Sequence, residues 1–417
     1  MPDSAGAAPM NRRLPEPVSE FARYLRTETV GGMVLLGATA IALIWANSPW
    51  KGGYETVRDA RLGPAALGLD LTVGQWATDG LLALFFFVVG LELKRELVVG
   101  ELSSIRRALL PVAAALGGMV VPAGLALLVG RGAPGMDQAW AIPVATDIAF
   151  ALGVLALAGS SLPATARIFL LGLAVADDLG AIVVIAVVFS AGIHLLGLLV
   201  AAACAATFWY LQRRRVRAWW LYVPLALVTW AAVHESGIHA TIAGVVLGLL
   251  VRVRADPGEE HAPAVWLEHR LQPWSAGLCV PVFALFAAGV PLGAQALRTV
   301  VTDPVPLAVV AGLLVGKVIG IAGSAALVMR LVPGSRPRGL GGRDILAVSM
   351  LGGVGFTVSL LIAELSLADL PAEMEAAKAA VLLASTAAAL IAAALLLRRR
   401  RVHSGAEPRS DTGSTPE

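Results

Sequence analysis

Long runs of hydrophobic residues alternate with short polar segments along almost the whole chain, and this pattern predicts membrane-spanning helices. An α-helix needs about 20 predominantly apolar residues to cross ~30 Å of hydrocarbon. We count twelve such stretches; the eighth is short, and the fourth and eleventh contain glycine or polar residues at mid-span. They occupy residues 30–46, 77–93, 108–130, 138–159, 167–190, 195–211, 218–236, 239–251, 275–291, 304–328, 344–366 and 377–397.

The close spacing of these stretches predicts one membrane domain over residues 21–398, with polar tails at 1–20 and 399–417. Spans 3–5 and 10–12 each consist of three helices with an interrupted middle one, and the two sets run in opposite directions. This is the layout of an inverted repeat. The predicted fold class is therefore an all-α polytopic membrane protein of twelve transmembrane helices, with helices 4 and 11 interrupted.

The longest connection on the predicted outer side, residues 47–76, contains a weaker pattern. Residues 67–73 alternate apolar and polar side chains, residues 57–61 form a second short segment, and Gly63-Pro64 supplies a turn between them. This predicts a small external β-hairpin.

Composition and charge agree with a membrane protein. The 417 residues are 57% hydrophobic and 15% charged, whereas soluble domains carry about 25% charged residues. This excludes an ordinary cytosolic enzyme, a disordered chain and a nucleic-acid binder. The predicted cytoplasmic segments hold 25 Lys and Arg residues and the predicted external segments hold 6. Both termini are therefore expected in the cytoplasm, with the basic loops against anionic lipid headgroups.

Four ionisable residues lie near the middle of predicted spans, namely Asp147, Asp177, Asp178 and Lys317. Each costs roughly 2.5–3.5 kcal/mol on the membrane-insertion scale. Such groups face the bundle interior and usually mark ion or proton paths. A buried ion pair that only fixes helix packing is the structural alternative, but three acids against one base leave at least one carboxylate unmatched.

The two neighbouring aspartates suggest exchange chemistry. Asp177 and Asp178 differ by about 100° around a helix, so they flank a cavity rather than point along one line. A carboxylate oxygen is a hard ligand suited to a small cation, and the same group can carry a proton. A site that binds either a cation or protons, and not both, produces exchange.

Helix breakers lie close to these charges in the sequence. The fourth span contains Pro143 and Gly153 around Asp147, and the eleventh contains Gly352, Gly353 and Gly355. The ends of interrupted helices carry partial charges of about ±0.5. We expect Asp147 to balance facing N-terminal ends and Lys317 to balance facing C-terminal ends.

Over roughly residues 20–398 the chain resembles the NhaA family of bacterial Na+/H+ antiporters. The resemblance rests on five motifs in the family's order and spacing: FFFVVGLELKREL at 85–97, ATDIAFA at 145–151, DDLGAI at 177–182, SGIHAT at 236–241 and GGVGFTVS at 352–359.

The resemblance implies roles for individual residues. Asp177 and Asp178 are implied to bind Na+ and carry protons, with Asp177 paired to Lys317, and Thr146 and Asp147 to lie where helices 4 and 11 cross. It further implies roles in the ion pathway or in the response to pH for Asp79, Glu92, Glu96 and His239. For Glu92 and Glu96, ordinary pairing with Lys94 and Arg95 at the membrane interface remains the alternative.

The implied activity is electrogenic export of Na+ or Li+ in exchange for external protons, for Na+ and pH homeostasis, by a secondary transporter and not an enzyme. No cofactor is expected; the partners are the lipid bilayer, monovalent cations, protons and a second copy of the chain, and no nucleic acid. The expected location is the bacterial inner (plasma) membrane. A symporter on the same fold and, less favoured, an intramembrane aspartyl protease are the alternatives.

Overall fold

The computed structural model describes residues 28–65, 69–158, 164–190, 192–257, 259–333, 335 and 341–404. The expected tail at 1–20 and most of the expected tail at 399–417 lie outside these residues. The last helix, α20, continues to Ser404, six residues past the predicted end of the membrane domain at 398.

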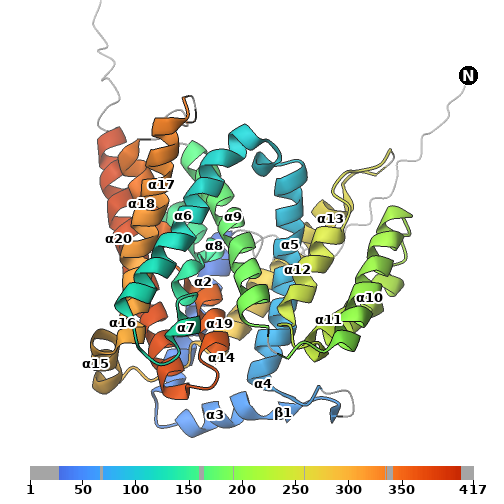
Figure 1. Cartoon of the computed structure of the whole chain (residues 1–417), viewed down its shortest axis with the longest axis horizontal. Helices are drawn as coiled ribbons and strands as arrows, with labels where there is room; N and C mark the ends of the chain where they lie inside the picture. Colours follow the sequence, from blue (N-terminus) through green and yellow to red (C-terminus); the bar gives the residue numbers. More distant parts are fainter. Residues whose placement is uncertain are drawn as a thin grey trace, which may run out of the picture.

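The first half of the chain forms a bundle of long helices with one small cap at one end (Figure 1). The elements are α2 (Glu28–Ala46), α3 (Lys51–Asp59), β1 (Arg61–Leu62), β2 (Leu71–Thr72), α4 (Val73–Gln75), η2 (Trp76–Leu81), α5 (Leu82–Val98), η3 (Glu101–Ser103), α6 (Ile105–Val129), α7 (Met136–Ala139), η4 (Ile142–Val144), α8 (Ile148–Ala158), α9 (Ala164–Val188) and α10 (Leu195–Arg213).

The second half adds further helices and closes the bundle. These are α11 (Trp219–Glu235), α12 (Thr241–Leu250), α13 (Pro263–Trp274), η5 (Ser275–Cys279), α14 (Val280–Ala287), α15 (Ala294–Thr302), α16 (Pro304–Ala311), η6 (Gly312–Gly316), α17 (Lys317–Leu331), α18 (Gly342–Leu351), α19 (Phe356–Ser366) and α20 (Pro371–Ser404). Proline opens α13, α16 and α20, where its missing N–H costs no helical hydrogen bond.

All twelve predicted stretches contain helix in the part of the chain that the structure describes. Within the described residues, seven helices are long and apolar enough to cross a membrane by themselves, or up to nine if each bent pair counts as one span. The others are short, such as α12 with 10 residues, or interrupted. The predicted class, a helical protein with several membrane spans, is confirmed. The length and composition of the helices alone do not give the predicted number of twelve spans.

The two predicted interruptions are present. Between η4 and α8 the chain is non-helical at residues 145–147, and between α18 and α19 it is non-helical at residues 352–355, where the two helices are bent by 48°. The interrupted segments therefore lie in the middle of α6–α9 and of α16–α20, the two predicted repeats. The helices α6 and α17 pack along each other (Figure 1).

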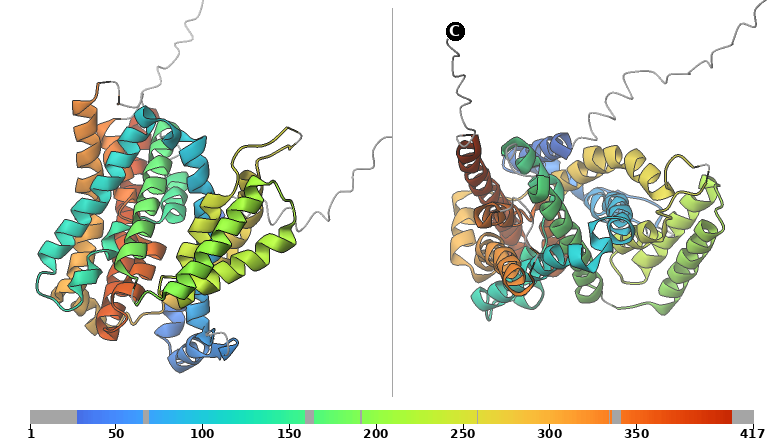
Figure 2. Two further views of the ribbon diagram at one scale, coloured as in Figure 1. Left: turned by 45° about the vertical axis from the view of Figure 1, so that its right-hand side comes forward. Right: turned by 90° about the horizontal axis from the view of Figure 1, so that it is seen from above.

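Glycines bring two pairs of helices into backbone contact. A Cβ on Gly320 in α17 would meet the carbonyl oxygen of Gly117 in α6, and one on Gly90 in α5 would lie 2.6 Å from the carbonyl oxygen of Val245 in α12. Any larger residue would separate the helices at these points. The pair α10–α11 lies on the other side of the molecule from α16–α18 and α20 (Figure 2).

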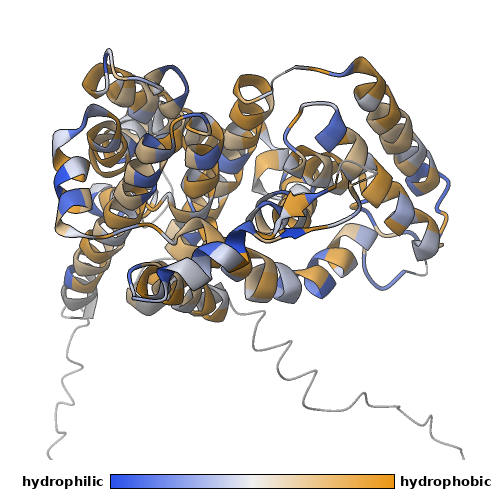
Figure 3. Ribbon diagram, turned by 90° about the horizontal axis from the view of Figure 1, so that it is seen from below, coloured by the Kyte–Doolittle hydropathy of each residue, from blue (hydrophilic) through white to orange (hydrophobic). Residues whose placement is uncertain are grey.

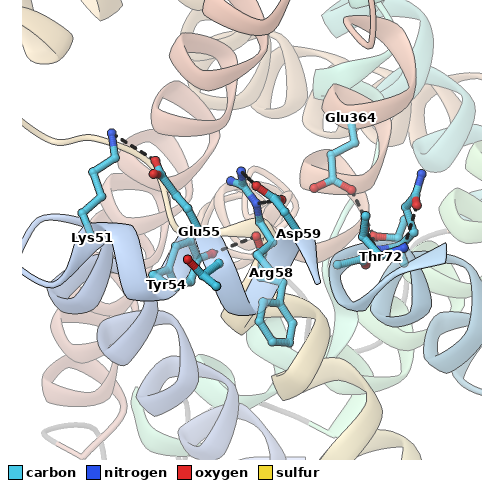
Figure 4. Close-up of polar contacts among 12 residues, drawn as sticks. Lys51, Tyr54, Glu55, Arg58, Asp59, Thr72 and Glu364 are labelled. Atoms are coloured by element: carbon cyan, nitrogen blue, oxygen red, sulfur yellow. Dashed lines mark hydrogen bonds and ion pairs between the residues drawn. The ribbon is translucent and has the colours of Figure 1, made fainter. Parts of the chain in front are cut away.

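The predicted hairpin is confirmed only in part. The strands β1 and β2 pair antiparallel, with Arg61 opposite Thr72. Residues 57–59 belong instead to α3, where Lys51 pairs with Glu55 one turn away and Arg58 pairs with Asp59 (Figure 4). This helix is amphipathic, with Tyr54 buried, and the polar helix lies across the end of a mainly hydrophobic bundle (Figure 3).

Candidate functional site

A buried ion pair lies at the centre of the bundle. The Nζ atom of Lys317, at the start of α17, is 2.6 Å from Oδ2 of Asp177 in α9. The exposed fraction of the side chain is 0% for Lys317 and 1% for Asp177. The pairing that the resemblance implies is therefore present in the structure.

Lys317 also serves the end of the first interrupted helix, as predicted. Its Nζ donates a hydrogen bond to the carbonyl oxygen of Val144, the last residue of η4, and another of 3.0 Å to Oγ1 of Thr146. An ammonium group is favourable beside carbonyl groups that lack an intrahelical partner.

Asp147 balances the opposite kind of helix end. Its Oδ1 accepts from the N–H of Phe150 in the first turn of α8, at 3.0 Å. Its Oδ2 accepts from both the N–H and the hydroxyl of Thr357 in the first turn of α19, at 3.1 and 2.7 Å. One carboxylate thus satisfies the N-termini of two half-helices.

The two non-helical segments cross and are bonded to each other. The N–H of Asp147 donates to the carbonyl oxygen of Val354 at 2.6 Å, and Oγ1 of Thr146 donates to the carbonyl oxygen of Gly352 at 2.8 Å. Ser359 donates from Oγ to the carbonyl oxygen of Ile142 at 2.7 Å. The crossing therefore holds both broken helices in one unit.

Gly353, one of the three glycines of the second crossing segment, allows the backbone of η6 to approach closely. A Cβ on Gly353 would lie 2.5 Å from the carbonyl oxygen of Leu313 in η6, so the second crossing segment contacts the helix that carries Lys317. The N–H groups of Gly355 and Phe356 each donate to Oγ of Ser385 in α20, at 3.2 Å.

Asp178, like Asp177, has one oxygen atom that makes no hydrogen bond to the described residues. Its side chain is buried, and its Oδ1 has no hydrogen-bond partner within the described part of the chain; the same holds for Oδ1 of Asp177. Buried oxygen atoms without partners are costly, so these two are the natural positions for a proton or a cation.

Glu92 and Glu96 are one turn apart on α5. Glu92 lines a small cavity of about 60 Å³ with Gln272 and Ser275, and it acts electrostatically on Asp178. Glu96 is buried and its Oε1 is 3.7 Å from Arg95, which agrees with the interfacial-pairing alternative for this residue. Arg95 also binds Glu268 of α13 at 2.6 Å.

The two remaining predicted residues lie together at the α3 end. Asp79 is in η2, and the Nδ1 atom of His239 is 3.7 Å from its Oδ1. Asp79 and His239 therefore form a cluster of their own, separate from the central site around Lys317. Only the family resemblance assigned both clusters to one function.

Several site residues were missed from the sequence. Thr357 donates its hydroxyl to Asp147, and Ser385 accepts from N–H groups at the start of α19. The only sequence signal of either residue was a polar side chain inside an apolar run. Two π-helical turns also had no clear sequence signal: η2, which contains Asp79, and η6, which is followed directly by Lys317. Such turns occur often at functional sites. Lys378 is buried in α20 and bound to Glu364 at 2.6 Å.

Two crossed broken helices beside a buried acid–base set define a membrane carrier of small ions. The family model for Na+/H+ antiporter 1 matches residues 22–396. The chain belongs to this family of antiporters, which are secondary transporters and not enzymes.

Named relatives cover almost the same length. The chain is 67% identical over 362 residues to Na(+)/H(+) antiporter NhaA 1 of Saccharopolyspora erythraea, covering 87% of each chain. It is 60% identical over 400 residues to Na(+)/H(+) antiporter NhaA 2 of Rhodococcus jostii, covering 95% of this chain and 97% of the relative. The solved structure of the sodium proton antiporter MjNhaP1 from Methanocaldococcus jannaschii matches with a TM-score of 0.48 and 13% identity, over 93% of this chain and 99% of that one.

Proposed function

We propose that this Na+/H+ antiporter exports Na+ or Li+ in exchange for external protons, using Asp177 and Asp178 as the shared site. The observation that carries the proposal is the partnerless Oδ1 of Asp178 beside the Asp177–Lys317 pair. A site with one carboxylate already neutralised and one without a partner has a net charge of −1 when all three groups are ionised. One monovalent cation neutralises it, and protons on the two carboxylates take away the oxygen ligands that this cation needs.

Binding of the cation competes with two existing interactions. Na+ prefers several oxygen ligands, and the nearby oxygen donors are the two carboxylates and Oγ1 of Thr146. Coordination by Asp177 draws its Oδ2 away from Lys317, which keeps its contacts with Val144 and Thr146. The ion pair therefore opens as the cation binds and closes again after its release.

Transport then follows from movement of the crossed helices. The bonds between the two non-helical segments keep them together, so the crossed unit moves relative to the rest and exposes the site to the other side. Two carboxylates can be reloaded with two protons after one Na+ has left. Exchange with that ratio moves net charge, and the membrane potential then assists export.

The proposed setting is the plasma membrane, with both termini in the cytoplasm and the α3 end outside. This agrees with the excess of basic residues in the loops at the opposite end. Cations enter past Glu92. We also propose that two copies of the chain form a homodimer, partly through the β1–β2 hairpin. The strands of this hairpin have two residues each and leave edges open for pairing. The mechanism uses no resident cofactor, and its physiological result is Na+ and pH homeostasis.

The geometry disfavours the protease alternative. An aspartyl protease needs two carboxyl groups that share one proton. Here Asp177 binds Lys317, and both oxygens of Asp147 are occupied by helix N-termini. No observation favours the symporter.

The test is Asp178→Asn in everted membrane vesicles, with dissipation of a pH gradient after addition of Na+ or Li+ as the measurement. We expect the response to disappear, because a neutral amide cannot exchange a proton for a cation. The control is Asp369→Asn, an exposed residue between α19 and α20, which is expected to keep the response. Wild-type exchange by Asp178→Asn would remove Asp178 from the site.

A further inference from the structure

Two imidazole rings face the same carboxylate at the α3 end of the molecule. The Nδ1 atom of His234 is 3.8 Å from Oδ2 of Asp79, and the Nδ1 atom of His239 is 3.7 Å from Oδ1. Each carboxylate oxygen thus has its own histidine.

The local fold explains how the two rings meet. His234 is in the last turn of α11, Gly237 has a positive φ of 79° that ends this helix, and His239 precedes α12. The left-handed conformation at Gly237 is easily reached only by glycine. Asp79 is in the π-helical turn η2, where the widened backbone shifts its side chain relative to the rest of α5.

Trp230 fixes both partners of the outer contact. Its indole N–H donates to the carbonyl oxygen of Asp79 at 2.8 Å, and its ring stacks on His234 with centroids 6.1 Å apart. Trp230 also stacks on Trp76 of η2 at 5.7 Å. The position of His234 against Asp79 is therefore supported from two sides.

Other charged groups surround Asp79 besides the two histidines. Glu364 of α19 acts electrostatically on Asp79; it accepts from the hydroxyl of Thr78 at 3.2 Å and is bound to Lys378. On α3, Arg58 is paired with Asp59 (Figure 4). The exposed Glu235 follows His234 in α11.

The two histidines differ in their access to water. The side chain of His234 is 25% exposed, whereas that of His239 is 7% exposed. The Nε2 atom of His239 is buried and has no hydrogen-bond partner among the described residues. In this cluster the carboxylate of Asp79 therefore lies between the partly exposed imidazole of His234 and the buried imidazole of His239.

We propose that His234, Asp79 and His239 form a proton relay at the α3 end, in which His234 accepts external protons and passes them through Asp79 to His239. This proposal rests on the proposed function, since it supplies the protons that reload Asp177 and Asp178. Histidine is the side chain whose ordinary protonation change falls between roughly pH 5 and 8, the range in which such a relay must work.

Each step is a proton transfer. His234 takes up an external proton at Nε2, and its Nδ1–H bond breaks as an O–H bond forms at Oδ2 of Asp79. The protonated carboxyl group turns so that this O–H faces His239 and gives the same proton to its Nδ1, while the proton on the buried Nε2 passes to water on the inner side. A turn of each imidazole ring then resets the relay. The separations of 3.7–3.8 Å exceed a direct hydrogen bond. A small side-chain rotation or one bridging water closes each gap.

The experiment separates proton supply from cation binding in proteoliposomes. Two fluxes are measured over a series of external pH values at fixed internal pH: Na+-driven proton flux, and exchange of radioactive Na+ for unlabelled Na+, which needs no net proton movement. The variants are His234→Phe, which keeps an aromatic ring on Trp230 but carries no proton, and His234→Ala, which leaves space for added imidazole. The control is His194→Gln, an exposed histidine before α10.

We expect both His234 variants to lose proton flux by roughly tenfold at alkaline external pH, while Na+–Na+ exchange stays within about twofold of wild type. External imidazole should restore proton flux in His234→Ala but not in His234→Phe. Wild-type pH dependence in both variants, or equal loss of both fluxes, would overturn the relay. Absence of both fluxes in the unmodified protein would instead count against the proposed function.

Discussion

The Nζ atom of Lys317 lies 2.6 Å from Oδ2 of Asp177, and both side chains are buried. Removing one member of a buried pair leaves the other charge without compensation, at a cost of about 3–5 kcal/mol. Lys317→Ala should therefore lower the melting temperature of the purified protein in detergent, measured by intrinsic fluorescence.

The double variant Lys317→Ala, Asp177→Asn tests the cause. Because it removes both charges, it should recover part of the lost stability, and the double-mutant cycle gives the interaction energy. Additive losses would mean that the two groups do not act as a pair.

The hydroxyl of Thr357 supports Asp147 at the crossing of the broken helices. Thr357→Val keeps the shape but leaves an oxygen of Asp147 short of one donor, and should cost about 1–3 kcal/mol of stability. The matched control is Thr386→Val, since the hydroxyl of Thr386 only bonds the carbonyl oxygen of Leu382 within its own helix. Equal melting temperatures for the two variants would argue against a special role for Thr357.

The contact between Gly320 and Gly117 predicts a position-specific effect in α17. A Cβ on Gly320 would meet the backbone of α6, whereas one on Gly323, a turn away, meets nothing within 4 Å. Gly320→Ala should reduce thermal stability and transport. Gly323→Ala should be neutral or stabilising by up to about 1 kcal/mol, because alanine favours the helix. Size-exclusion profiles and vesicle transport distinguish the two.

A charge network links the α10–α11 connection to the α12–α13 connection. Arg252 binds Asp256 at 2.5 Å and Glu259 at 3.0 Å, and Arg217 binds Glu259 at 3.1 Å. The hydrogen bond from Arg252 lowers the pKa of Glu259 from its ordinary value of 4.5 to about 2. A lowered pKa gives stabilisation that is present above the ordinary value and is lost as the pH falls through about 2.

This network should therefore not act as a pH sensor near neutrality. We expect Glu259→Gln to shift the melting temperature by a similar amount at every pH between about 6 and 9, with no displacement of the pH–activity profile. A shift of that profile by about one pH unit or more would show that the network takes part in pH response.

The sequence predicted the class of fold and the central charges because both follow from the cost of polarity in lipid. Asp147, Asp177, Asp178 and Lys317 stand out in apolar runs, and the structure brings them together around the crossing. The predicted hairpin segment at 57–61 was wrong for residues 57–59, which belong to α3, because a short amphipathic segment fits both a helix and a hairpin edge. The His234–Asp79 contact could not be predicted, because it depends on a π-helical turn and a glycine turn distant in sequence.

The glycine seams have a consequence for how the molecule works. Because α5 lies backbone-to-backbone on α12, and α6 on α17, neither pair can shear internally without breaking its packing. The helix α9 packs extensively on α6 and only slightly on α5. In the proposed transport cycle, we therefore expect the relative movement to occur between α5 and α9. The bound ion would then move together with the helices that carry Asp178 and Lys317.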